Sequence, residues 1–92
     1  MRVEIQCINK SNRFSPHERI SYIGGLNPNG TRWKISLDKA IQGIELGKWQ
    51  FFVRVGSLPV DVIIANHNGH KYLKTINDGL EPNNLLRLPE CP

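Results

Sequence analysis

The stretch VDVIIANHNGHKYLKT, residues 60–75, decides how this chain folds. Two runs rich in β-branched and aromatic residues flank Asn68-Gly69, a pair suited to a tight turn with positive φ at both central positions. The pattern predicts a β-hairpin with strands at residues 60–65 and 71–75. Its second strand would carry Lys71 on one face and His70, Tyr72 and Lys74 on the other. Cations and an aromatic ring on a rigid hairpin favour a binding module over an enzyme.

Three further segments alternate apolar and polar residues, as half-buried strands do. They cover residues 2–9, 32–36 and 49–55. The aromatic side chains that face inward on the last two segments are Trp33, Trp49 and Phe51. All three are expected to fill the core. Phe52 points the other way, beside Arg54, and we favour burial of its ring under the C-terminal leucines over an exposed ring that could stack on a base.

Two segments carry signals for helices. Ser36 is a suitable N-cap for a helix over residues 37–46, in which apolar residues repeat at helical spacing. Residues 15–18, Ser-Pro-His-Glu, contain a capping box with proline at the first helical position. They predict a short helix that continues through residue 23 and stops at Gly24-Gly25.

Together these elements predict a single α+β domain over residues 1–92, which is long enough for one modest core. Its antiparallel sheet would have four to five strands, and one main helix would pack on one face of that sheet. The short N-terminal helix and an irregular C-terminal tail, residues 76–92, would complete the fold.

The composition narrows the class of protein. A hydrophobic content of 39% indicates a folded chain, and a formal net charge of +4 fits nucleic acid, an anionic membrane surface or an acidic protein partner. No signal peptide and no bilayer-spanning apolar run is visible, so a cytoplasmic protein without a membrane partner is expected. Cys7 and Cys91 could pair, but the sequence does not place them close together, and in a reducing cytosol free thiols are the default expectation.

Metal and catalytic chemistry have weak support in the sequence. His67 and His70 bracket the hairpin turn, but zinc would need further ligands, and no Cys-x-x-Cys or His-x-x-x-His spacing is present. No nucleophile has an evident base, and Gly24-Gly25 is an isolated pair rather than a phosphate-binding loop. We therefore expect no metal, no cofactor, no small-molecule substrate and no catalytic residues.

The candidate partner-binding residues are cations spread over the predicted strands, together with one aromatic ring. They are Arg2, Lys10, Arg13, Arg32, Lys34, Arg54, Lys71, Tyr72 and Lys74. A phosphate backbone needs spaced cations of this kind, and each neutralised contact releases counterions. The alternative interpretation is a solvated sheet face whose charges serve solubility and edge protection.

Several blocks resemble a family of short bacterial and phage proteins of unknown function. The blocks are CINK, HERI, IGG, RWKIS, AIQGIELGKW, VDVIIA, KYLKT and PNNLLRLPEC, and they run from Cys7 to Cys91. This resemblance implies a shared fold and supplies no catalytic residues. More loosely, the chain looks like a phage anti-CRISPR protein that acts on type I RNA-guided surveillance complexes.

The second resemblance implies a non-catalytic inhibitor inside the host bacterial cell. It would contact the protein and the guide RNA of the surveillance complex and would block pairing of the target DNA. Two alternatives remain open from the sequence. One is a free-standing RNA- or DNA-binding module, and the other is a protein-interaction module that uses the sheet edge or the leucine-bearing tail.

Overall fold

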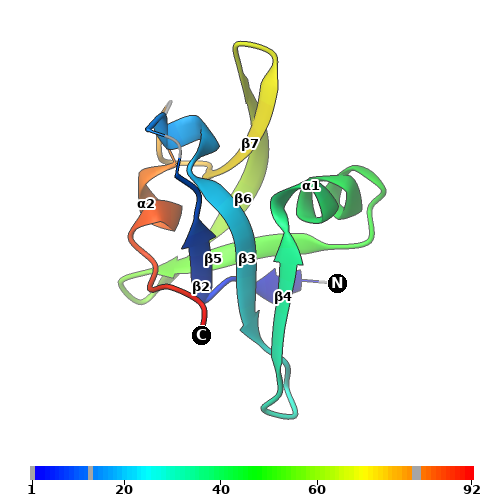
Figure 1. Cartoon of the computed structure of the whole chain (residues 1–92). Helices are drawn as coiled ribbons and strands as arrows, with labels where there is room; N and C mark the ends of the chain where they lie inside the picture. The colour runs from blue at the N-terminus through cyan, green and yellow to red at the C-terminus, as the bar shows by residue number, and fades with distance from the viewer. Residues whose placement is uncertain (1, 13, 80–81) are drawn as a thin grey trace.

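The computed structural model describes residues 2–12, 14–79 and 82–92. Within these residues the chain is mostly β and forms two sheets (Figure 1). The four-stranded sheet has the order β1 (Arg2–Glu4), β5 (Gln50–Val55), β6 (Leu58–His67) and β7 (His70–Thr75). The three-stranded sheet has the order β2 (Cys7–Lys10), β3 (Ile20–Leu26) and β4 (Arg32–Ser36).

The predicted single antiparallel sheet of four to five strands is wrong. The N-terminal segment, expected as one strand over residues 2–9, is divided: β1 pairs in parallel with β5, and β2 pairs antiparallel with β3. Between them the backbone N–H of Ile5 still donates to Phe52 at 2.8 Å, and that of Gln6 donates to Gly24 at 2.8 Å. The segment thus passes from one sheet to the other, and the two sheets enclose the core from different sides.

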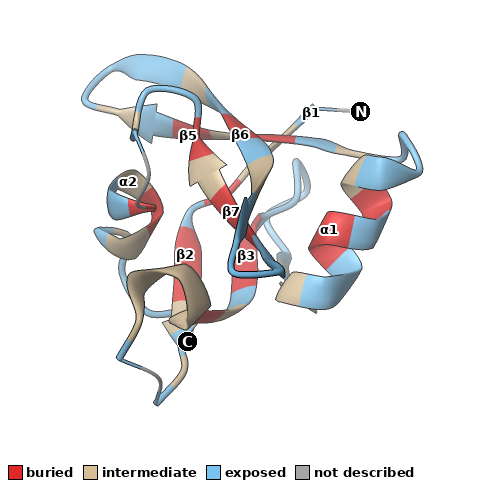
Figure 2. Cartoon of the chain, turned by 90° about the horizontal axis from the view of Figure 1, so that it is seen from above, coloured by how far each residue is buried: buried red, intermediate tan, exposed pale blue. Residues whose placement is uncertain are grey.

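The helix α1 (Leu37–Glu45) begins where the sequence predicts. The Ser36 hydroxyl accepts from the backbone N–H of Lys39 at 3.3 Å, which is the expected N-cap. The helix does not lie on one sheet alone, because it contacts β3 and β4 of one sheet and β7 of the other. Seen from above, α1 stands beside both sheets, and red marks its buried residues (Figure 2).

The hairpin prediction is confirmed. β6 and β7 pair antiparallel around Asn68 and Gly69, whose φ angles are 52° and 83°. Both strands are longer than predicted, because pairing starts at His67 and His70 next to the turn. The positive φ at both turn positions is the conformation that an Asn-Gly pair tolerates best.

The predicted helix over residues 15–23 is wrong. Only a single 3-10 turn, η1 (Pro16–Glu18), forms there, and the chain then enters β3. The register of β3 against β2 skips Ser21, so that residue forms a β-bulge. Because of the bulge, Ile20 and Ile23 are both buried although they stand three residues apart. Their spacing imitates a helix in the sequence.

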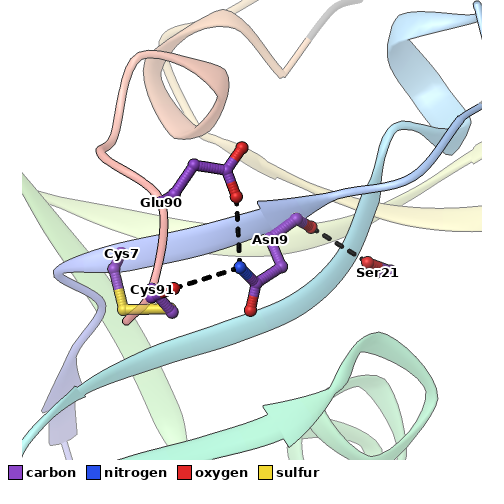
Figure 3. Close-up of a disulfide and its surroundings, with 5 residues drawn as sticks. All are labelled: Cys7, Asn9, Ser21, Glu90 and Cys91. Carbon is purple, nitrogen blue, oxygen red and sulfur yellow. Dashed lines mark hydrogen bonds between the residues drawn. A yellow bond between two sulfur atoms is a disulfide. The ribbon is translucent and has the colours of Figure 1, made fainter.

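The C-terminal tail is more regular than predicted. It contains the short helix α2 (Asn83–Leu86), and Glu90 forms a parallel β-bridge with Ile8. The expectation of free thiols is also wrong. The bridge brings the Cα atoms of Cys7 and Cys91 to 4.9 Å, and the two residues form a disulfide (Figure 3).

The core lies between the two sheets, α1 and α2 (Figure 2). Its buried side chains come from every one of these elements: Ile5, Ile8, Ile20, Ile23, Ala40, Ile41, Phe51, Val53, Val62, Leu73 and Leu85. Trp33 and Trp49, expected to fill the core, are half-buried at its margin. The outer surfaces of the sheets are therefore the places where charged and aromatic side chains can meet a partner.

Candidate functional site

Each sheet has an outer surface that carries cations beside an aromatic ring. On the four-stranded sheet the register places Glu4, Phe52 and Asp61 in one row across β1, β5 and β6. We call the surface formed by Arg2, Glu4, Phe52, Arg54 and Asp61 the four-stranded face. Phe52 is half-buried there, and the guanidinium groups of both arginines lie over its ring.

The arginines of the four-stranded face are neutralised. Arg2 Nη2 lies 2.7 Å from Asp61 Oδ1, and Arg54 Nε lies 3.6 Å from Glu4 Oε1. Both guanidinium groups also lie over the ring of Phe52, with Cζ-to-centroid distances of 4.5 Å for Arg2 and 5.9 Å for Arg54. Exposed ion pairs of this kind contribute at most about 1 kcal/mol each to folding. These two ion pairs nevertheless leave the four-stranded face with little net positive charge to attract a phosphate.

The outer surface of the three-stranded sheet has a different balance. Tyr22, Leu26, Arg32 and Lys34 share one side of β3 and β4, since Leu26 pairs with Arg32 and Tyr22 with Ser36. We call these four residues the three-stranded face. Tyr22 is 44% exposed, and Lys34 Nζ lies 5.3 Å from the centroid of its ring. In Figure 1 no helix or strand lies in front of β3 and β4.

The cations of the three-stranded face have no acidic partner within the described residues. No described carboxylate comes within 4.0 Å of Arg32 or Lys34, whereas elsewhere in the described residues three lysine or arginine side chains pair with carboxylates. An exposed ring beside Lys34, with Arg32 farther along the same strand, suits stacking on a base together with neutralisation of phosphates.

The disulfide lies against this same face. A Cβ atom on Gly24 would stand 2.9 Å from Cys91 Sγ and 3.0 Å from Cys7 Sγ, so only glycine admits the disulfide here. Asn9 fixes the tail beside it by donating to Glu90 Oε2 at 3.1 Å and to the Cys91 carbonyl at 3.4 Å (Figure 3). A small cavity of about 90 Å³ is lined by the disulfide, Arg32, Lys34 and the last residue, Pro92.

The hairpin does not present the cation and ring platform that its sequence suggests. Tyr72 is only 4% exposed, so its ring is out of reach of a base. Lys71 Nζ is paired with Glu45 Oε2 at 2.5 Å, and half-buried Lys74 donates to the Thr75 carbonyl at 3.4 Å. Lys10 is exposed at the end of β2, away from these residues in the sheet order, and Arg13 lies outside the described residues.

All three histidines gather beside the hairpin turn, a grouping that the sequence analysis missed. The rings of His17 and His67 are stacked with centroids 3.7 Å apart and an interplanar angle of 11°. His17 also meets the edge of Tyr72 at 4.8 Å, and His70 Nε2 lies 3.8 Å from Glu18 Oε1. No local sequence pattern could have predicted the cluster, because His17 comes from η1 and is 50 residues away from His67 in the sequence.

Stacked imidazoles do not converge their nitrogen atoms on one point. Accordingly, no group of three or more possible ligands in the described residues could hold a metal ion. Two nearby serine hydroxyls are already engaged, since Ser11 donates to the Glu18 carbonyl and Ser21 to the Asn9 carbonyl. The rings of His17, His67 and Tyr72 pack η1 against the hairpin.

Residues 4–89 match one protein family along almost the whole chain. The chain belongs to the DUF3892 family, whose description is a protein of unknown function. No curated protein and no solved structure matches it. The DUF3892 match includes every residue of the three-stranded face and the whole hairpin. It leaves out Arg2 of the four-stranded face and both Cys91 and Pro92 of the tail.

The family match confirms membership in a family without an assigned activity, and it does not extend to the anti-CRISPR resemblance. The part of this DUF3892 chain that the structure describes has no helix long and apolar enough to cross a bilayer.

Proposed function

We propose that this chain is a non-catalytic binding protein whose three-stranded face takes single-stranded nucleic acid, RNA in the first instance. The observation that carries the proposal is the contrast in charge pairing between the two sheet surfaces. Lys34 stands over the exposed Tyr22 ring and Arg32 lies farther along β4, opposite Leu26. No described carboxylate lies within 4.0 Å of either cation, while Arg2 and Arg54 are both paired with carboxylates.

The two kinds of group on the three-stranded face would have separate roles. Each cation that meets a phosphate releases counterions, and for single strands it adds about 0.7 to the slope of log affinity against log salt. A base stacked on an aromatic side chain contributes about 1–3 kcal/mol whatever its identity. Such a surface would hold a strand without reading much of its sequence.

The most specific form of the proposal names the partner. In that form the chain inhibits a type I RNA-guided surveillance complex, whose guide RNA supplies the phosphates and whose protein subunits supply the rest of the interface. Blocking of target DNA pairing would follow from occupancy alone, without a chemical step. The support for this form is the anti-CRISPR resemblance of the sequence together with the cations of the three-stranded face.

Fluorescence anisotropy with a labelled twelve-nucleotide single-stranded RNA at low salt tests the general proposal. We expect the R32Q/K34Q variant to bind at least about 10-fold more weakly than wild type, with a salt slope reduced by about 1.4. The matched control is K39Q/R87Q, which removes the same charge from α1 and from the end of α2. Equal losses in both double variants would show that net charge, not the three-stranded face, governs binding.

A pull-down with purified type I surveillance complex, loaded with guide RNA at low salt, tests the specific form. Retention of wild type and loss of R32Q/K34Q is the expected result. If the complex does not retain the wild-type chain while the labelled RNA does bind it, the named partner is wrong and the general proposal stands.

A further inference from the structure

A second concave site lies on the opposite side of β4 from the three-stranded face. It has a volume of about 200 Å³ and is lined mainly by rings and aliphatic side chains: Val3, Asn27, Trp33, Ile35, Trp49 and Phe51. The ring of Phe51 lies 5.9 Å from that of Trp33 and 5.9 Å from that of Trp49. The volume is below the range of about 300–1,000 Å³ that drug-sized ligands need, so the pocket suits one flat ring system.

Two glycines make room for the tryptophans of this pocket. A Cβ atom on Gly43 of α1 would stand only 2.1 Å from the Trp49 ring. A Cβ atom on Gly25 of β3 would stand 3.0 Å from Trp33 Nε1. Glycine inside a helix lowers helix stability by about 1 kcal/mol relative to alanine. Gly43 therefore weakens α1 at the point where the Trp49 ring packs against it. The aromatic walls are thus fixed by close backbone contacts.

The charge around the pocket indicates what kind of ring it would accept. Lys48 Nζ lies 5.4 Å from the centroid of the Trp49 ring. None of the pocket-lining residues is acidic. Aromatic cages that hold quaternary ammonium groups exploit attraction between rings and a cation, which the lysine would oppose here. An aromatic group attached to phosphate fits this surrounding better.

Asn27 supplies a polar group at the pocket. Its Nδ2 atom donates to Thr31 Oγ1 at 2.9 Å, and this leaves a second amide hydrogen and the carbonyl oxygen for a ligand. Donor and acceptor on one amide match the polar edge of a nucleobase, which single-strand binding proteins read after the base leaves its stack.

β4 connects the pocket to the three-stranded face. Trp33 and Ile35 line the pocket, while Arg32 and Lys34 belong to the opposite side of the same strand. β4 is also the outermost strand of its sheet, so its outer edge carries no neighbouring strand in the described residues. A nucleic acid strand that crosses this edge would meet cations on one side and aromatic rings on the other.

We propose that the pocket of Trp33, Trp49 and Phe51 takes one unstacked nucleobase of the strand that the three-stranded face holds. This inference rests on the proposed function, because the phosphates of that strand bring the base to β4. It adds a base-binding site that the cations alone do not imply.

The test uses the two pocket tryptophans, which are the only tryptophans of the chain, as the reporter. Two eight-nucleotide probes are compared at low salt: a wholly abasic strand, and the same strand with one uracil at its centre. We expect the uracil probe to bind roughly 5- to 100-fold more tightly and to change the tryptophan emission, because one stacked base contributes about 1–3 kcal/mol. A free uridine monophosphate arm distinguishes a base in a strand from a mononucleotide ligand.

The matched variants are Ile35→Phe, which fills the pocket, and Ile63→Phe, which makes the same change on β6 outside it. Ile35→Phe should reduce the advantage of the uracil probe over the abasic probe and abolish the change in tryptophan emission, although the exposed Tyr22 ring can still stack on the uracil. Ile63→Phe should bind like wild type. Asn27→Ala should lower the affinity for the uracil probe several-fold. Because Asn27 is exposed, this variant should fold and can replace Ile35→Phe if that variant does not.

The possible outcomes separate the two proposals. If both probes bind equally and lose affinity with salt, the base-binding pocket is overturned while the proposed function stands. If neither probe binds, the proposed function fails, and the pocket proposal fails with it. If free uridine monophosphate binds as tightly as the uracil probe, the pocket is a mononucleotide site and the role of the strand is overturned.

Discussion

The two outer sheet surfaces contain similar side chains but differ in what surrounds them. The four-stranded face has two arginines around Phe52, and each arginine meets a carboxylate. The three-stranded face has Lys34 over Tyr22 and Arg32 nearby, with no described carboxylate in contact. The number of cations on a strand is therefore a poor guide to binding. The net positive charge of a sheet surface depends on the acidic residues that neighbouring strands place beside those cations.

The largest expected effect concerns the disulfide, which only the three-stranded face carries. The C7S/C91S variant should lose about 2–5 kcal/mol of folding free energy, because the disulfide closes a loop across a sequence separation of 84 residues. Urea unfolding measures the loss, and wild type in excess dithiothreitol is the control. If the variant and the reduced wild type are as stable as the oxidised protein, the disulfide does not hold the tail against β2 and β3.

Alanine at each aromatic ring sharpens the comparison. Tyr22→Ala should weaken single-stranded RNA binding by roughly 5- to 100-fold, because an exposed stacking ring is lost, and should cost at most about 1 kcal/mol of stability. Phe52→Ala should cost about 1–2 kcal/mol of stability, because its ring is half-buried, and should leave RNA affinity unchanged. Anisotropy measures the RNA affinity of each variant, and urea unfolding measures its stability. If Phe52→Ala weakened RNA binding and Tyr22→Ala did not, the four-stranded face would be the RNA-binding surface.

Neutralising the acids of the four-stranded face is expected to remove the difference between the faces. In the E4Q/D61N variant Arg2 and Arg54 lose their ion-pair partners, so this surface should gain affinity for single-stranded RNA by about 3- to 10-fold. The salt dependence should become steeper by up to about 1.4. Asp38→Asn with Asp78→Asn removes the same charge elsewhere and is the control, since an asparagine oxygen at position 78 can still accept from the backbone N–H of Asn84. An equal gain in the control would attribute the effect to net charge.

The smallest expected effect is the coupling between Arg2 and Asp61. A double-mutant cycle with Arg2→Gln and Asp61→Asn should give about 0.2–1 kcal/mol at low salt, because both side chains are about half exposed. The coupling should fall in high salt as charges are screened. A coupling above about 2 kcal/mol would mean that this pair is a structural anchor of β1 rather than a surface ion pair.

The elements with strong local signals could be predicted from the sequence. Asn68-Gly69 predicts the hairpin because few other pairs accept positive φ twice, and Ser36 predicts α1 because its hydroxyl satisfies a free N–H of the first turn. The segment after Pro16 misleads because Ile20 and Ile23 have helical spacing. A bulge at Ser21, which depends on pairing with β2, is what buries both in a strand.

The candidate site could be predicted only in part. The alternation in β4 places Arg32 and Lys34 on one side and Trp33 on the other, as the sequence indicates. It could not show that Asp61 reaches Arg2 or that Glu45 reaches Lys71, since these partners are far apart along the chain. Tyr72 looked exposed by alternation, but η1 covers it, because the ring of His17 packs against it.

The link between Cys7 and Cys91 also determines how this polypeptide would respond to mechanical tension. With the cysteines oxidised, a pulling force applied at residues 1 and 92 would pass through the sulfur atoms and bypass the intervening backbone. Only residues 1–6 and Pro92 lie outside the covalent ring, so β1 would peel from β5 while the remaining strands stay unloaded. In optical tweezers the oxidised protein should therefore extend only a short distance. After reduction of the disulfide the whole chain should unfold and the extension should be long.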